Sequence, residues 1–207
     1  MCIRDSTCTI KDLGRLKTDA IKDAIIGKNK LVTVDLFPIN ITDDKDLMDE
    51  QVEKADLIIC ATDNNASRFY LTQCLLKYNK VALFGRAVTR AEGGDVFRYR
   101  PGGPCYNCLV GSRAHAMATE EITNRSQLPA YVSEADANAM IQVGLSSDIE
   151  PICNLIVKLA LVELSRGENS GIESLESELE YDYYMWANRR ERRHVAWAPF
   201  NLSLIHI

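Results

Sequence analysis

One short stretch combines a strand-like apolar run with polar groups that could hold a metal ion. Residues 55–68 read ADLIICATDNNASR, in which the apolar run stops at Asp63 and is followed by Asn64 and Arg68. Carboxylate oxygens are ligands that Mg²⁺ prefers, and Mg²⁺ in turn binds nucleotide phosphates. Asp63 is therefore a candidate magnesium ligand. It could equally cap the helix that follows, and the two roles are compatible.

Lys17 is a second candidate, because its charge stands near the first turn of an expected helix and could meet a phosphate. It follows Gly14 in the stretch GRLK. Most lysines in such a place are simply solvated, so this residue alone is weak evidence.

A pair of cysteines, Cys105 and Cys108, lies in the proline- and glycine-rich stretch PGGPCYNC. Two thiolates at this spacing can bind one zinc ion, although a structural zinc site needs four ligands. His115 and His194 could supplement the pair, but neither has convincing spacing. A redox pair and a coincidence are the alternatives. A redox pair usually opens a helix after a strand, whereas proline and glycine precede this one, so zinc is favoured.

The overall composition excludes several classes of protein. The formal charge of −5 argues against nucleic acid as the main partner, which would require a basic surface. No stretch is apolar for long enough to span a bilayer. The seven cysteines are an odd number without an export signal, which indicates free thiols or metal ligands and a cytoplasmic protein.

The candidate residues must be positioned by the elements around them. Apolar periodicity predicts the following order in the first half: helix Leu13–Ile26, strand Leu31–Phe37, a loop and short helix over Thr42–Glu53, strand Leu57–Ala61, helix Asn64–Tyr78 and strand Val81–Phe84. A strand, a helix and a strand in succession predict a parallel sheet, with ligands bound at the carboxyl ends of its strands. Asp63 stands at such an end.

The second half has a different pattern. We expect a β-hairpin with strands Ala87–Ala91 and Asp95–Arg100, turning at 92–94, and then the loop that carries the two cysteines. A polar stretch over 111–147 precedes a helix, Asp148–Arg166, with one apolar stripe. An acidic stretch and an aromatic segment, Tyr181–Trp197, which could be a strand followed by a surface segment, come last. Three further cysteines are expected in the core: Cys60, Cys74 and Cys153.

Taken together, these motifs resemble the ThiF/MoeB/HesA family, which is related to the ubiquitin-activating enzymes. The family pattern A-D-x-x-x-x-x-T-D-N-x-x-x-R matches Ala55 to Arg68, with Gly-x-x-Lys upstream at Gly14–Lys17 and P-C-x-x-C downstream at Pro104–Cys108. The resemblance implies an α/β fold, with a Rossmann-like, mostly parallel sheet flanked by helices, a β-hairpin and a Cys-x-x-C zinc knuckle.

The resemblance also implies an activity: adenylation of the C-terminal glycine carboxylate of a ubiquitin-like or sulfur-carrier protein, with ATP and Mg²⁺. Asp63 would hold Mg²⁺ and Lys17 would stabilise charge on the phosphates. Arg68 and Asn64 would help to form the nucleotide site, or Arg68 would organise it instead. Cys105 and Cys108 would bind zinc. Family members are usually dimers.

The chain also departs from the family pattern. No Gly-x-Gly-x-x-Gly loop precedes Lys11, no second Cys-x-x-Cys follows, and Leu109–Ser147 contains no cysteine for a thioester. We therefore expect an inactive fragment: a partial adenylation domain over 8–167, a truncated extension over 168–201, and non-native ends at 1–6 and 202–207. The alternatives are a non-catalytic subunit of a heterodimeric activating enzyme and an NAD-dependent oxidoreductase. The cysteine pair has no place in the oxidoreductase.

Overall fold

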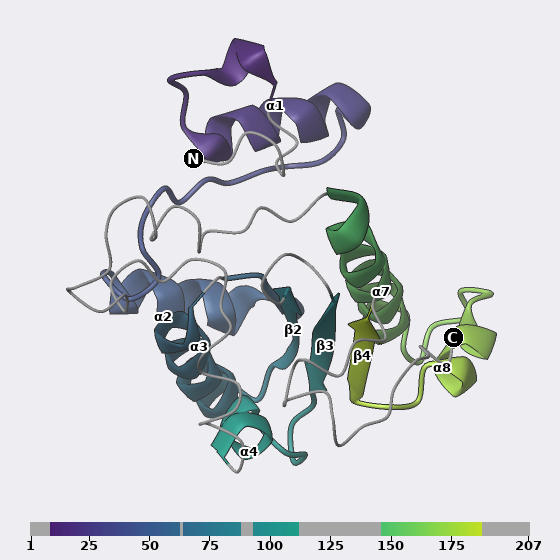
Figure 1. The fold of residues 1–207 in the computed structure, drawn as a ribbon. Coiled ribbons are helices and arrows are strands. Elements are labelled where there is room, and N and C mark those ends of the chain that lie inside the picture. Colours follow the sequence, from purple (N-terminus) through teal and green to yellow (C-terminus); the bar gives the residue numbers. More distant parts are fainter. Residues whose placement is uncertain (1–8, 63, 88–92, 112–145, 188–207) are drawn as a thin grey trace. The chain divides into compact units, whose positions relative to one another are not determined.

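The computed structural model describes residues 9–62, 64–87, 93–111 and 146–187 (Figure 1). The chain divides into two compact units, one up to Lys45 and one from Asp46 onward, and each is described by itself. Within the described residues, no helix is long and apolar enough to cross a membrane.

The first unit carries helix α1, Lys17–Lys28. The predicted helix began at Leu13, but the chain before Lys17 forms a turn instead, with Gly14 at φ 81°. This left-handed conformation costs glycine little and other residues more, which explains the glycine of the GRLK stretch. Gly27 lies within this helix. The helix ends one residue later, with Asn29 as its C-cap.

The turn before α1 is held by a capping box and an ion pair. Thr9 and Asp12 bond each other reciprocally across the short 3₁₀ helix η2, Ile10–Asp12. Arg15 then bridges Asp12 at 3.0 Å and Asp23, on α1, at 2.5 Å. These contacts fix the backbone that leads into Lys17.

The predicted strand Leu31–Phe37 is wrong, because the chain there is irregular. Leu31 is 94% exposed, and Val32 and Phe37 are also exposed. A strand needs a neighbouring strand to pair its backbone groups. Among the described residues, the sheet offers this segment no pairing. The alternation of apolar residues in this segment predicts a strand but does not show whether a neighbouring strand exists.

The second unit is a four-stranded sheet with helices on both faces (Figure 1). The sheet has the order β1-β2-β3-β4, with strands Leu57–Cys60, Val81–Ala87, Gly93–Tyr99 and Tyr183–Ala187. Its helices are α2 Lys45–Lys54, α3 Asn65–Tyr78, α4 Tyr106–Gly111, α7 Ser146–Leu164 and α8 Glu173–Glu178.

The sheet is mixed. β1 and β2 are parallel, as the strand–helix–strand order predicted, but β2–β3 and β3–β4 are antiparallel. The expectation of a mostly parallel sheet is therefore wrong for the described strands. The helical crossover through α3 keeps β1 and β2 parallel, whereas β2 and β3 are too close in sequence for a crossover.

The predicted hairpin exists, but its strands are placed differently. β2 continues through Ala87 and pairs with β3, so residues assigned to a separate strand belong to β2 as far as 87. Gly93 and Gly94, expected in the turn, begin β3 instead. A Cβ on Gly94 would lie 2.1 Å from the Ile152 side chain of α7 and 2.2 Å from the Arg86 carbonyl oxygen. This glycine permits close packing of the helix on the sheet.

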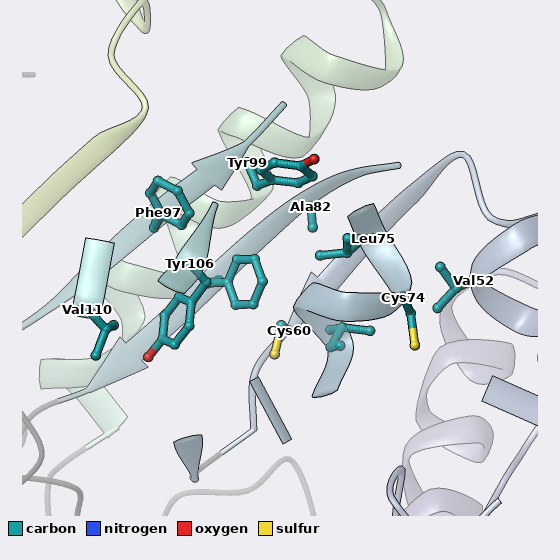
Figure 2. Packing of buried hydrophobic residues seen from close by; sticks show 11 residues of the cluster. Val52, Cys60, Cys74, Leu75, Ala82, Phe97, Tyr99, Tyr106 and Val110 are labelled. Atoms are coloured by element: carbon teal, nitrogen blue, oxygen red, sulfur yellow. The ribbon is translucent and has the colours of Figure 1, made fainter. Parts of the chain in front are cut away.

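Side chains alternate between two buried clusters on opposite faces of the sheet. The first cluster packs α3 and α4 against one face and includes Phe84, Phe97 and Tyr106 (Figure 2). The second packs α7 and α8 against the other face and includes Leu83 and Val96. Successive residues of one strand thus enter different cores, as strand geometry requires.

Helix α7 confirms the predicted apolar stripe, since Ile152, Ile156 and Leu159 are all buried. It begins at Ser146, two residues before the predicted start. Cys60 and Cys74 are buried as expected, but Cys153 is exposed. Cys153 follows Ile152 directly, and adjacent residues on a helix point in different directions, so it leaves the stripe.

The segment after α8 is held to the sheet by Arg98 of β3. Its side chain is fully buried and donates to the carbonyl oxygens of Leu179, Glu180 and Tyr181 at 2.7–3.1 Å. It also bonds Glu163 of α7 at 3.1 Å. β4, which follows this segment, is thereby tied to the body of the unit. The proposed boundary at residue 167 stays a prediction.

Candidate functional site

The turn between β1 and α3 is capped by Asn64. Its Oδ1 accepts a hydrogen bond from the Ser67 backbone N–H at 2.8 Å, and its backbone is extended at φ −138°. This bond satisfies one of the N–H groups that the first helical turn leaves open. The alternative reading of Asp63 as the helix cap is therefore wrong, because Asn64 has that role.

Asp63 itself lies outside the described residues, so its role as a magnesium ligand stays a prediction. The frame around it is described. Cys60, the last residue of β1, is 2% exposed, and its Sγ lies 3.5 Å from Thr62 Oγ1. Only the last residue of β1 is buried, since Ile59 is 51% exposed, and the capped helix α3 begins on the other side of the connection.

Arg68 is buried beneath this turn, with only 3% of its surface exposed. Its Nη2 donates to the carbonyl oxygen of Thr62, and its Nη1 donates to Asn65 Oδ1 at 3.3 Å. The acceptors described for the Arg68 guanidinium, Thr62 and Asn65, therefore both lie next to the turn in the sequence. This geometry suits the organising role that was the alternative to nucleotide contact.

Two residues that support the turn were not singled out from the sequence: Asn65, the first residue of α3, and Tyr106, the first residue of α4. Asn65 Oδ1 accepts a second hydrogen bond, from Tyr106 Oη at 2.9 Å. Tyr106 is the residue directly after Cys105, and it is fully buried. Its ring stacks on Phe84 with the centroids 4.9 Å apart. An aromatic spacer between the cysteines was the available signal, but nothing in the sequence shows that its hydroxyl reaches α3.

The cysteine pair has a geometry that fits a metal ion. The Sγ atoms of Cys105 and Cys108 are 3.7 Å apart, and the pair is not disulfide-bonded. Two thiolates at about 2.3 Å from a tetrahedral zinc ion would be about 3.8 Å apart. Although burial by itself raises the pKa of the Cys105 thiol, hydrogen bonds from Cys108 and the backbone of Asn107 lower this pKa below its ordinary value. A lowered pKa favours the thiolate that metals bind.

The cysteine pair lies at the start of helix α4, a position that is also typical of redox pairs. The pair was expected not to open a helix, but α4 begins at Tyr106, immediately after Cys105. Helix position therefore does not separate zinc binding from redox chemistry. Within the described residues, no group of three or more potential metal ligands occurs, and both His115 and His194 lie outside them.

Lys17 is the first residue of α1, as the sequence predicted for a residue near the helical first turn. Its side chain is exposed. It belongs to the first unit, whereas Asn64 and Arg68 belong to the second. The described residues therefore bring together Asn64 and Arg68, and the role of Lys17 stays a prediction.

The chain matches the ThiF family over residues 3–175. It is 28% identical over 106 residues to the sulfur carrier protein adenylyltransferase of Thermus thermophilus, covering 49% of this chain and 38% of that protein. It is 35% identical over 100 residues to the molybdopterin-synthase adenylyltransferase of Escherichia coli K12, covering 47% and 38%. It is also 28% identical over 97 residues to the adenylyltransferase and sulfurtransferase MOCS3 of Aedes aegypti, covering 47% and 22%.

The fold is similar to a solved structure, that of Escherichia coli MccB with ATP, at a TM-score of 0.60 and 16% identity. The match covers 88% of this chain and 48% of that protein. The matched part thus spans less than half the length of each of these proteins. Because the family match extends through both units and includes the β1–α3 turn and the cysteine pair, the chain belongs to the ThiF family.

Proposed function

We propose that this protein is an adenylyltransferase that activates the C-terminal carboxylate of a sulfur-carrier or ubiquitin-like protein with ATP. Family membership and the names of its relatives support this activity. The structural observation that carries the proposal is the β1–α3 turn. The buried end of β1 at Cys60, the Asn64 cap and the Arg68 bonds to Thr62 and Asn65 order the described residues that flank Asp63 in the sequence.

In this reaction a carboxylate oxygen of the carrier attacks the α-phosphorus of ATP. The bond from that phosphorus to the bridging oxygen breaks, and pyrophosphate leaves with the electron pair. The products are an acyl-adenylate on the carrier and free pyrophosphate. Two anions must approach each other, so positioning and charge neutralisation supply most of the catalysis.

We propose that Asp63 holds Mg²⁺ and that Lys17 contacts the phosphates. Bound Mg²⁺ would neutralise charge on the phosphate oxygens. The side chain of Lys17 is exposed and makes no ion pair among the described residues, which leaves it available for a phosphate. Asn64 and Arg68 would keep the turn in one conformation, so that little reorganisation is needed when ATP binds.

Cys105 and Cys108 are proposed to supply two ligands of a structural zinc ion. The 3.7 Å separation of their Sγ atoms supports this assignment. The remaining ligands would come from outside the described residues. We also propose a cytoplasmic protein, because its seven cysteines are an odd number without an export signal, and a homodimer or heterodimer, because family members are usually dimers.

The printed sequence contains no Gly-x-Gly-x-x-Gly loop. We therefore propose that the 207-residue chain does not exchange pyrophosphate by itself and that a longer chain carrying such a loop (the complete protein) does. Both should be tested side by side.

The test is pyrophosphate exchange into ATP, measured with a carrier protein that ends in glycine. Asp63→Asn is expected to lower exchange at least a hundredfold, because it removes the negative charge that would hold Mg²⁺. Asp56→Asn is the matched control, since Asp56 is exposed and precedes the same strand. Equal exchange by Asp63→Asn and Asp56→Asn would refute the proposed role of Asp63.

A further inference from the structure

Tyr106 connects the cysteine pair to the β1–α3 turn. It stands between Cys105 and Cys108 in the sequence, and its Oη donates to Asn65 Oδ1 at 2.9 Å. The hydrogen bond joins α4 to the first residue of α3. A residue that would normally be read as a spacer in a metal-binding motif therefore makes a specific contact at the candidate nucleotide site.

The position of Tyr106 is fixed by its surroundings. Its side chain is fully buried, and its ring packs against Phe84, Phe69 and Phe97 with centroid distances of 4.9, 5.7 and 6.5 Å. The guanidinium carbon of Arg86 lies 5.9 Å from the ring centroid. A tyrosine enclosed in this way has few rotamers available, so its hydroxyl is held at one place.

The contact continues from Asn65 through Arg68 to Thr62. Asn65 Oδ1 also accepts from Arg68 Nη1 at 3.3 Å, and Arg68 Nη2 donates to the carbonyl oxygen of Thr62. That carbonyl belongs to the planar peptide unit that joins Thr62 to residue 63. A donor that holds the Thr62 carbonyl therefore restricts the backbone at Thr62.

From these contacts we infer that Tyr106 and Asn65 are positioning residues, which transmit the order of the Cys105–Cys108 turn to the backbone around Thr62. The consequence for catalysis rests on the proposed adenylyltransferase function, whereas the structural link rests on the hydrogen bonds alone. When a metal ion holds both cysteines, the backbone that carries Tyr106 is fixed at both sides. The β1–α3 turn should then be more ordered with the metal than without it.

Hydrogen exchange of the 207-residue chain tests the link without any activity measurement. Tyr106→Phe keeps the buried ring and removes only the hydroxyl. Amides in peptides covering 60–72 should exchange about fivefold faster, as expected for loss of one neutral hydrogen bond. Amides of β3, residues 93–99, should be unchanged and report that the fold is intact.

Tyr99→Phe is the matched control. Tyr99 is buried in the same cluster at 2% exposure, and among the described residues its hydroxyl makes no hydrogen bond to the turn. In Figure 2 the hydroxyls of Tyr99 and Tyr106 point to opposite sides of the cluster. Equal exchange over 60–72 in the Tyr99→Phe and Tyr106→Phe chains would overturn the inference.

A pair of substitutions at Asn65 separates positioning from packing. Asn65→Asp keeps an oxygen that can accept from both Tyr106 and Arg68, so protection over 60–72 should remain close to that of the unchanged chain. Asn65→Leu removes the acceptor at similar volume and should accelerate exchange as much as Tyr106→Phe does. If Asn65→Asp and Asn65→Leu behave alike, the hydrogen bonds do not position the turn.

The metal and the activity give two further readouts. Removal of zinc with a chelator should accelerate exchange over 60–72 in the unchanged chain and have less effect in Tyr106→Phe, and equal effects in both would contradict the link. In the complete protein, Tyr106→Phe should raise KM for Mg·ATP about fivefold, with KM unchanged in Tyr99→Phe. If the complete protein shows no exchange of pyrophosphate at all, the proposed function fails, whereas the hydrogen-exchange result still decides the structural link.

Discussion

Arg86 and Asp95 are register partners on β2 and β3, and they form a two-point ion pair inside the sheet. Arg86 Nε donates to Asp95 Oδ1 at 2.8 Å, and Nη2 donates to Oδ2. Tyr183 of β4 donates to the same carboxylate at 3.2 Å. Burial by itself lowers the pKa of Arg86, but the Asp95 carboxylate raises this pKa above its ordinary value. One buried carboxylate thus joins three strands.

Asp95→Asn should destabilise the protein by about 3 kcal/mol, because it removes the charge that compensates a buried guanidinium. Urea unfolding monitored by circular dichroism measures this loss. Asp49→Asn is the control, since Asp49 pairs with Lys77 on the surface, and exposed pairs contribute little. Similar losses of unfolding free energy for Asp95→Asn and Asp49→Asn would show that the buried pair stabilises the protein no more than the exposed one.

The buried pair illustrates what the sequence could not predict. The alternation of residues 95–100 indicates a strand, but it gives no sign that Arg98 is fully buried. Arg98 is satisfied by Glu163 and by carbonyl groups at Leu179–Tyr181, all more than 60 residues away. Tertiary packing brings such distant partners together, and the periodicity of a short segment carries no information about them.

Glu163 should make the stability depend on acid. Burial by itself raises the pKa of Glu163, but hydrogen bonds from Arg100 and Arg166 outweigh burial and lower this pKa below 4.5. A carboxylate with a lowered pKa contributes stability that is fully present above its unfolded pKa and is lost as pH falls through the folded value. We therefore expect Glu163→Gln to cost about 3 kcal/mol near pH 7.

The difference between Glu163→Gln and the unchanged chain should shrink as pH falls from 4.5, the unfolded value, through the lower folded pKa, because the Glu163 carboxyl becomes neutral in the folded protein only there. Urea titrations at a series of pH values measure that difference. Glu50→Gln serves as the comparison, because Glu50 forms an exposed pair with Lys54. A difference for Glu163→Gln that stays constant down to pH 3 would contradict the assignment.

Gly94→Ala should be much more harmful than Gly85→Ala. An added Cβ at Gly94 would lie 2.2 Å from the Arg86 carbonyl oxygen, which cannot move without distorting the sheet. At Gly85 the closest atom would be Ile156 Cδ1, the far end of a flexible side chain, at 2.4 Å, and the other neighbours are also side-chain atoms at 3.5 Å or more. We expect a loss of about 3 kcal/mol for Gly94→Ala and about 1 kcal/mol for Gly85→Ala.

The control for this comparison is Ile152→Val, which shortens the other side chain that meets Gly94. Combined with Gly94→Ala it should restore little stability, because the backbone contact remains. Full recovery in the double variant, seen by thermal unfolding, would show that α7 packing alone excludes a side chain there.

The cysteine pair should bind zinc through both thiolates. Cys105→Ser and Cys108→Ser are each expected to abolish stoichiometric zinc, measured by elemental analysis of the purified protein. Cys153→Ser is the control, because Cys153 is exposed on α7, an element that contributes no ligand in this proposal. A protein without zinc that forms a reversible Cys105–Cys108 disulfide would instead support the redox alternative.

The sequence predicted the helices and strands around the candidate site better than the contacts between them. The predicted strand Leu57–Ala61 and helix Asn64–Tyr78 each lie within one residue of the observed β1 and α3, because an apolar run and the polar residues after it are local signals. The roles of Asn65 and Tyr106 were missed, since their bond joins segments 41 residues apart. The strand Leu31–Phe37 was wrong because a strand also requires a partner.

Direct detection of the reaction product tests the central claim. The complete protein is mixed with ATP, Mg²⁺ and a carrier protein that ends in glycine, and the carrier is analysed by mass spectrometry. The account predicts that the carrier gains one adenylyl group at its C-terminal carboxylate, and that Asp63→Asn prevents this while Asp56→Asn does not. A carrier that stays unmodified although ATP binds, or one modified equally by the Asp63→Asn protein, would contradict it.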